Sequence, residues 1–321
     1  RNDMRNTSKM TTLENKFPLL SVEHGCIISK DADITVAFEV ELPELYTVTG
    51  AEYEAIHGCW CKAIKVLPDF SVVHKQDWFV KENYAPDLQN SDMSFLSRSY
   101  ERHFNERPYL HHQCYLFLTK TTKERMAHQS NFSTLCRGHI IPKEIKNKET
   151  VARFLDAVEQ FARIINDSGY ISLRRLTDDE ITGTERTTGL VGKYLSLSTE
   201  NVQCLEDMEL SASGMRIGNK HLCLHTLSQT EDLPTEVSTD NRFERLSTDR
   251  SDCRLSFAAP VGLLLSCNHI YNQYVFIDNS DETLQKFEKT ARNMHSLSRY
   301  SRQNAINKEW IEKTWHIYTM E

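Results

Sequence analysis

The sequence lacks a long apolar run and a secretory leader pattern. Its longest apolar stretch, Phe257 to Ser266, is too short to cross a bilayer and contains Pro260. The polar start from Arg1 to Lys16 has no apolar h-region, so we expect no signal peptide and a natural start at Met4 or Met10. Any contact with a membrane is therefore expected to run through a partner.

Two further absences concern thiols and charge. The nine cysteines form no dense, regularly spaced framework, which predicts free thiols in a reducing compartment. The net charge of -7 argues against a surface built mainly to hold nucleic-acid phosphates. With 39% hydrophobic and 26% charged residues, the chain of 321 residues has the composition of a folded protein with a sizeable core.

Motifs for phosphate binding and nucleophilic catalysis are also missing. The nearest approach to a P-loop is Thr187 to Tyr194, where Thr187 replaces the first glycine and Tyr194 replaces the Ser or Thr that meets the metal. No Gly-x-Ser-x-Gly elbow occurs. The acidic run Asp178 to Glu180 is better explained as charge at a helix start than as a catalytic carboxylate. We predict no catalytic and no cofactor-binding residue in this chain.

Metal ligation is not supported by the spacing of Cys and His. Zinc sites use paired ligands two to four residues apart that recur at fixed intervals. Cys59 and Cys61 lie on a predicted helix and do not face each other, and His111 and His112 point to opposite faces of a predicted strand. The other pairs considered are Cys136/His139, Cys223/His225 and Cys267/His269. We predict no metal, although a Cys/His pair could still meet in space.

The first part of the chain predicts strands and amphipathic helices in a mixed order. Residues 34 to 42 alternate between apolar and polar side chains, which is typical of a half-buried strand. Thr49 and Glu52 form a capping box for a helix that Pro68 stops. Strands are expected at 26–28, 70–84 and 110–120, and a helix at 91–106. Aromatic residues here are expected in the core: Trp60, Trp78, Tyr84 and Phe95.

The second part begins after a polar connection at 121–147. Apolar residues from Val151 to Ile165 form a wide helical stripe that ends at a C-terminal cap, Gly169. A strand is expected at 170–176, an irregular or partly helical stretch at 177–202, and two strands near 208–217 and 221–227. A long polar loop at 228–254 leads to a buried stretch at 255–265 and a strand at 271–278.

The chain is expected to end in a long helix starting near Asp281. Asn279 can cap it, with Glu282 three residues on, and ion pairs such as Glu288 with Arg292 support it. Leu284, Phe287, Ala291, Met294 and Leu297 form a stripe that we expect to pack on the sheet. The segment 306–318 is expected to fray or to self-associate.

These elements predict an α+β (mixed α/β) fold of mostly antiparallel sheets packed with helices, ending in a long helix. We place an N-terminal α/β subdomain at 13–125 and a second α+β subdomain at 126–280. Residues 281–321 are expected to be the long helix that begins a linker.

Several segments together resemble the N-terminal region of the TraG ATPases of conjugative transposons, a family of assembly ATPases in type IV secretion. The resemblance covers nearly the whole chain, without a catalytic motif, and departs from the family at 314–321. The matching segments are 13–18, 53–57 with 67–68, 77–79, 269–274, 286–289, 291–297 and 307–313.

The resemblance implies a role in conjugative DNA transfer. Family members continue into a P-loop motor that uses ATP and Mg²⁺, while the N-terminal part docks the motor onto inner-membrane components of the channel. It implies that this chain is a truncated, motor-less docking module, not an enzyme, in the cytoplasm and peripheral to the inner membrane through partners.

Two other functions stay open. The first is a nucleic-acid-binding module that handles the transferred strand, which would need a clustered basic groove with aromatic residues. The basic residues at 143–148 and Arg174–Arg175 are isolated or interleaved with acids, so nucleic acid is not the expected partner. The second is a metal-dependent enzyme, which rests only on the Cys/His pairs.

Overall fold

The computed structural model describes residue 12 and residues 17–44, 47–84, 94–122, 148–201, 205–211, 214–226, 237–256 and 265–297, without the side chains of 294–297. The expected mixed fold is confirmed: antiparallel sheets pack with six helices over the described residues, and a helix ends them. No described helix is both long and apolar enough to cross a bilayer.

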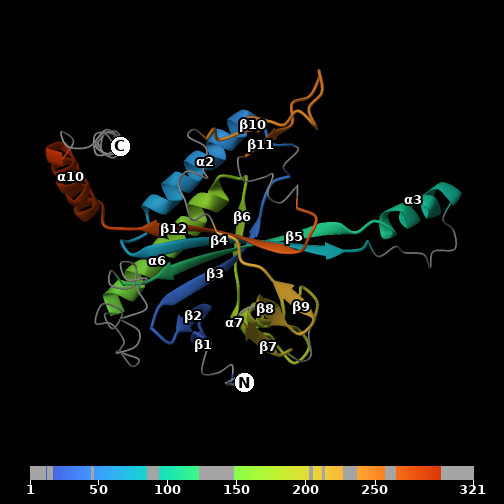
Figure 1. Cartoon of the computed structure of the whole chain (residues 1–321), viewed down its shortest axis with the longest axis horizontal. Helices are drawn as coiled ribbons and strands as arrows, with labels where there is room; N and C mark the ends of the chain where they lie inside the picture. The colour runs from blue at the N-terminus through green and yellow to red at the C-terminus, as the bar shows by residue number, and fades with distance from the viewer. Residues whose placement is uncertain are drawn as a thin grey trace, which may run out of the picture.

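A seven-stranded antiparallel sheet forms the centre of the molecule (Figure 1). Its strands follow the order β1-β2-β3-β5-β4-β12, and β6 pairs with the far end of β3. The predicted strands of this sheet are confirmed to within a few residues. They are β2 (Cys26–Ser29), β3 (Ile34–Glu41), β4 (Ser71–Glu82), β5 (Tyr109–Lys120), β6 (Ser172–Arg175) and β12 (His269–Ile277). The edge strand β1 (Leu19–Glu23) was not predicted.

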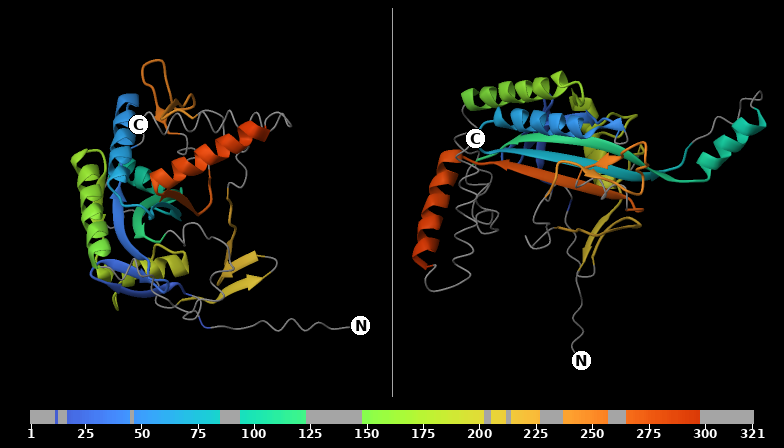
Figure 2. Two further views of the ribbon diagram at one scale, coloured as in Figure 1. Left: turned by 90° about the vertical axis from the view of Figure 1, so that its left-hand side faces the viewer. Right: turned by 90° about the horizontal axis from the view of Figure 1, so that it is seen from above.

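Two long helices, α2 (Gly50–Lys65) and α6 (Lys148–Asp167), cover one face of this sheet (Figure 2). The Thr49 capping box is confirmed, because the Thr49 hydroxyl accepts from Glu52 N and the Glu52 carboxylate accepts from Thr49 N. The stripe of α6 is also confirmed, since Phe154, Phe161 and Ile165 are fully buried against the sheet. Gly169 takes a positive φ of 73° just after the helix, where glycine is favoured.

The opposite face carries a smaller core under two short helices, α7 (Asp178–Thr182) and α8 (Leu190–Ser196). Ile181 and Leu190 pack there with Ala37 and Trp78 of the sheet. Ala37 is therefore buried on this second face of the strand at 34–41, whereas Glu39 and Glu41 on the same face are exposed, as the alternation predicted.

Elements on both sides of the expected boundary at 125–126 share this sheet and its cores. Strand β6 pairs with β3, β12 pairs with β4, and α6 packs on α2. Among the described residues, the division therefore does not separate two cores.

The region between α8 and β12 differs from the expected strands and loop. The strand expected at 208–217 is two strands of a hairpin, and the strand expected at 221–227 is short. The supposed loop at 228–254 contains a strand and the start of another. The observed strands are β7 (Met208–Ser211), β8 (Gly214–Ile217), β9 (Lys220–Leu222), β10 (Asn241–Arg242) and β11 (Arg254–Leu255). Of the stretch expected to be buried, Leu255 is buried but Leu265 is exposed.

The last described helix, α10 (Ser280–Leu297), has the expected cap but not the expected packing. Asn279 Oδ1 accepts from Glu282 N at 3.0 Å, and Glu288 pairs with Arg292 at 3.3 Å. The helix projects from the end of β12 (Figures 1 and 2), and neither Leu284 nor Phe287 joins a sheet core. The prediction that α10 packs on the sheet was wrong. The spacing of apolar residues identifies an apolar side of the helix, but it does not identify the element that this side contacts. Residues 306–318 lie outside the described residues.

The contrast between buried and exposed phenylalanines gives a stability test. Phe161 is fully buried, whereas Phe95 is 83% exposed. We expect Phe161→Ala to lower the free energy of unfolding by about 3–5 kcal/mol, because it leaves a cavity in the main core. Phe95→Ala should change it by less than about 0.5 kcal/mol. Urea unfolding followed by circular dichroism measures both, and equal losses would contradict the described packing.

Candidate functional site

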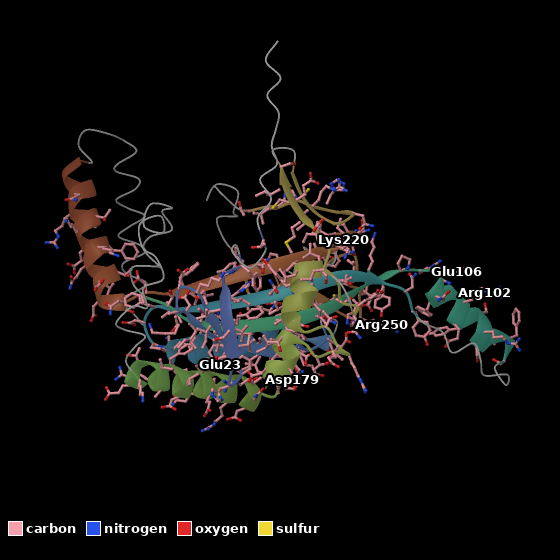
Figure 3. The ribbon with its side chains drawn as sticks, turned by 90° about the horizontal axis from the view of Figure 1, so that it is seen from below. Glu23, Arg102, Glu106, Asp179, Lys220 and Arg250 are labelled. Carbon is pink, nitrogen blue, oxygen red and sulfur yellow. The ribbon has the colours of Figure 1, made fainter. Side chains whose placement is uncertain are left out.

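The feature that departs most from a compact fold is a projecting arm. It consists of the far ends of β4 and β5 and the helix α3 (Phe95–Asn105), and we call it the α3 arm (Figures 1 and 2). The two strands pair without interruption from Ser71↔Lys120 to Glu82↔Tyr109. In Figure 3, Arg102 and Glu106 on the arm lie far from Glu23 and Asp179 on the body.

Local bonds hold α3 in place at the tip of the arm. Ser94 caps the helix by accepting from Ser97 N at 3.1 Å. Asn105 Nδ2 donates to the carbonyl of Tyr84 at 2.7 Å, and the Tyr84 hydroxyl donates to Glu101 at 3.4 Å. These bonds tie the helix to the chain leaving β4, so the arm presents a fixed helix.

The helix has an apolar stripe that no described residue buries. Leu96, Tyr100 and Phe104 are spaced by four residues and share one side. Their exposed fractions are 78%, 64% and 42%, and Phe95 beside them is also exposed. Tyr84 and Phe95 are therefore not core residues, contrary to the prediction, while Trp78 is buried and Trp60 packs on the core as expected. An exposed apolar stripe on a protruding helix is typical of a protein interaction site.

A second feature is a charged cluster on the helix-covered face of the sheet. Asp77 of β4 is buried, and its carboxylate accepts from Lys75 Nζ and, at 2.8 Å, from His112 Nε2 of β5. Burial by itself raises the pKa of the Asp77 carboxyl, but the bond from His112 and the charge of Lys75 outweigh burial, so the pKa is lowered. Asp77 is therefore ionised at neutral pH.

The chemistry available to this cluster is limited. Cys114 lies directly across from Asp77, and burial raises the pKa of its thiol to about 12. A thiol with that pKa is protonated at neutral pH and is a poor nucleophile. A carboxylate–imidazole pair can act as a general base, but neither of the two hollows described below reaches Asp77 or His112. The cluster is best explained as a satisfied buried charge.

The sheet face opposite α2 and α6 carries a row of stacked aromatic side chains. The His74 ring lies between Phe117 at 5.2 Å and Tyr274 at 4.1 Å, and Tyr274 stacks with Phe276 at 6.2 Å. Tyr274 and Phe276 are each more than half exposed. Burial lowers the pKa of His74, so the row is uncharged at neutral pH.

The P-loop-like stretch does not form a phosphate cradle. Gly189 precedes the short helix α8, and a Cβ on Gly189 would collide with the backbone of Gly183. Thr188 and Gly183 are bridged as in a small hairpin. The glycine at 189 is therefore required for close approach of two backbone segments, and Asp178 to Glu180 lie in the first turn of α7, as expected.

The Cys and His residues do not gather into a group of metal ligands in the part of the chain that the structure describes. Cys59 points to the carbonyl of Ile164, while Cys61 is exposed beside His57. Cys223 is exposed, and His269 bonds through Nδ1 to the carbonyl of Cys267. The pair Cys136/His139 lies outside the described residues.

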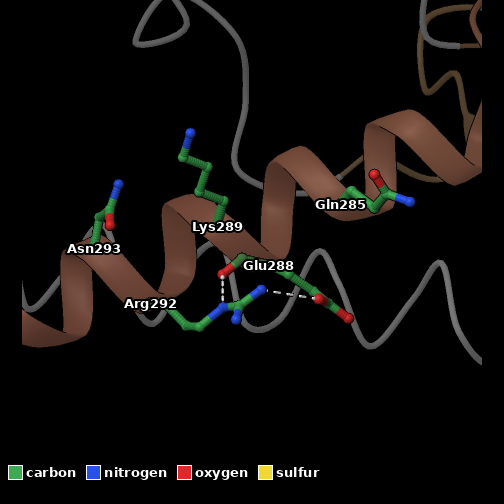
Figure 4. A pocket seen from close by; sticks show the side chains of 5 residues that line it. All are labelled: Gln285, Glu288, Lys289, Arg292 and Asn293. Atoms are coloured by element: carbon green, nitrogen blue, oxygen red, sulfur yellow. Dashed lines mark hydrogen bonds and ion pairs between the residues drawn. The ribbon is translucent and has the colours of Figure 1, made fainter.

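Two surface hollows lie elsewhere on the described residues. One is lined by a single polar side of α10, where Arg292 bonds to the carboxylate and the carbonyl of Glu288 (Figure 4). The other lies between the start of α6 and the turn after α2. Neither has the enclosed, largely apolar walls of a small-molecule site. The α3 arm, with its exposed apolar stripe, is the stronger candidate site. Sequence reasoning missed it, although the spacing of Leu96, Tyr100 and Phe104 was a visible signal.

Comparison with protein-family models gives a partial match. A family model described as "Domain of unknown function, B. Theta Gene description (DUF3875)" matches residues 6–58. Its described part contains β1, β2, β3 and the first half of α2, so the match falls on one edge of the sheet and not on the α3 arm. No curated protein matches the chain.

The buried charge of Asp77 predicts a specific pH dependence of stability. Because folding lowers the pKa of this carboxyl, its stabilising effect is complete above the unfolded pKa of about 3.9 and is lost as pH falls through the folded pKa. We expect Asp77→Asn to lower the free energy of unfolding by about 2 kcal/mol at pH 7. The stabilities of variant and wild type should then converge below pH 4.

Urea unfolding between pH 2.5 and 7 measures this difference. Glu288→Gln, which removes the exposed partner of Arg292, is the control and should change little at any pH. A difference between wild type and Asp77→Asn that stays constant over the whole range would contradict the role given to the Asp77 charge.

Proposed function

We propose that this chain is a docking module of a TraG-type conjugation ATPase, which holds the motor against inner-membrane components of a type IV secretion channel on its cytoplasmic side. The P-loop with its ATP and Mg²⁺ would belong to a motor outside these residues. The chain itself contributes binding surfaces and performs no chemistry.

The first support is the sequence resemblance, and two of its segments are neighbours in space. Asp77 to Phe79 on β4 pair directly with His269 to Tyr271 on β12. The Phe79 ring stacks on His269 at 4.6 Å and on His112 at 4.6 Å. Residues far apart in the sequence thus form one compact patch, which is expected if the resemblance reflects a common fold.

The observation that carries the proposal is the exposed stripe of the α3 arm. A protruding helix with an apolar side costs solubility unless a partner covers that side. Leu96, Tyr100 and Phe104 fit a helix-in-groove contact, in which anchors at helical spacing enter an apolar groove. Polar neighbours such as Arg98 and Arg102 can form the rim of such an interface.

The alternative function, a module that binds the transferred DNA strand, is supported by one observation and opposed by another. Stacked, exposed aromatic rings such as Tyr274 and Phe276 are what single-stranded nucleic acid binds. However, the positions of β4, β5 and β12 that share this face include no Lys or Arg. Since phosphate contacts supply most of such binding, the face fits an uncharged partner better.

The docking role can be tested on the α3 stripe. We expect the triple change Leu96→Ser, Tyr100→Ser and Phe104→Ser to weaken binding to inner-membrane vesicles that contain the conjugation channel. The loss should be more than about tenfold in affinity, because three apolar contacts are removed. Co-sedimentation with inverted vesicles from donor cells measures it, and circular dichroism checks the fold.

The controls separate the alternatives. A matched triple change of other exposed leucines, Leu210, Leu224 and Leu246 to Ser, should leave binding intact. Vesicles from cells without the channel should not bind, and equal binding to both vesicle types would mean that the helix recognises lipid and would refute a protein partner. A stripe variant that binds like the wild type would refute the role of the arm.

Nucleic acid gives a separate test. We expect that a single-stranded oligonucleotide does not bind with a dissociation constant below about 10 µM at physiological salt, because the aromatic face lacks cations. Fluorescence anisotropy measures this. Tight binding that weakens steeply with added salt, and that Tyr274→Ser reduces, would favour the alternative function in DNA binding.

A further inference from the structure

Strand β12 is an edge strand without the features that normally protect an edge. It pairs with β4 over all nine residues, and no described segment pairs with its other side. Its sequence, His269 to Ile277, contains no Lys, Arg, Asp, Glu, Pro or Gly. A long, regular, uncharged edge is a template for pairing with another strand.

The opposite edge of the sheet shows the protection that β12 lacks. Strand β1 has five residues, ends in Glu23, and its register with β2 shifts between Leu19 and Ser21. Short length, charge and irregularity are the usual means of preventing edge pairing. The two edges of one sheet therefore differ, which makes the open β12 edge a specific feature.

The backbone and side chains of β12 are both available for pairing. In an antiparallel pair, alternate residues bond to the partner strand, so the others direct N–H and C=O groups to the free side. The middle of the strand, residues 272–276, is exposed, including Tyr274, Val275 and Phe276. An added strand would bond to this backbone and cover these side chains.

We propose that β12 pairs with β12 of a second copy of this chain, antiparallel about a twofold axis at Gln273. This register is the one that pairs all nine residues. It places Ile270 opposite Phe276 and Asn272 opposite Tyr274 on one face, and Tyr271 opposite Val275 on the other. Cross-strand aromatic and apolar pairs of this kind stabilise sheets.

The uncharged, self-complementary sequence of β12 makes a second copy the occupant that fits. The chain carries a net charge of -7, so two copies repel each other over much of their surface. Strand β12 is an uncharged strip, and no like charges oppose one another in the twofold register. A twofold interface requires one patch to be complementary to itself, and β12 meets that condition.

The axis residue allows a sharp test, because it faces its own copy. Gln273 is exposed, so its substitution should leave the monomer folded. Gln273→Lys and Gln273→Glu each place two like charges directly opposite each other, and each should weaken the dimer roughly tenfold. Mixing the two variants places Lys opposite Glu and should restore a one-to-one heterodimer.

The readouts are sedimentation velocity of the whole chain and native mass spectrometry of the mixture, with one variant ¹⁵N-labelled. Gln285→Lys and Gln285→Glu on α10 make the same charge changes on an exposed residue away from β12 and should leave the dimer unchanged. A wild-type chain that is monomeric at 100 µM, or a dimer that both Gln273 variants leave intact, would overturn the proposal.

Discussion

The pairing of β4 with β5 is the constraint on which the rest of the molecule depends. Its twelve residue pairs run from the core, where Leu118 faces Val73, to the arm, where Tyr109 faces Glu82. One end of this ladder packs in the main core under α2 and α6, and the other end supports α3. Strand β3 attaches to one side of it and β12 to the other. A shift of β5 by one residue would turn its side chains to the opposite faces, and so would move His112 away from Asp77.

The buried charge of Asp77 helps to define that register. A carboxylate in a sheet core is unfavourable unless it is paired and hydrogen-bonded. Lys75 is on the same strand as Asp77 and is in reach in any register, whereas His112 is on the neighbouring strand and is in reach only in the observed alignment. On the opposite face, Trp78 Nε1 donates to Gln76, whose amide donates to Asn272 of β12. Polar bonds on the two faces thus specify the positions of β5 and β12 against β4.

Local signals predicted much of this fold, and non-local contacts escaped prediction. The Thr49 and Asn279 caps and the α6 stripe depend on residues within one or a few turns, so the sequence displays them directly. The Asp77–His112 pair joins residues 35 positions apart, and only the strand register reveals it. An apolar stripe on a helix does not by itself predict what the helix packs against. The stripe of α6 faces the sheet, whereas the stripes of α3 and α10 do not. The sequence shows that a surface is apolar, but the chain topology decides whether the molecule itself covers it.

The geometry links the two surfaces to which function is assigned. Strand β4 carries the α3 arm at its end and β12 along its side, so the position of one surface fixes the position of the other. In a twofold β12 pair, the β4 strands of the two copies run in opposite directions. Their α3 arms then extend from opposite ends of one continuous sheet. Such a pair cannot place both arms in one groove, and it suits two separate docking sites whose spacing matches the sheet. When two sites match that spacing, the second contact forms within the complex and strengthens binding without new contacts at either arm.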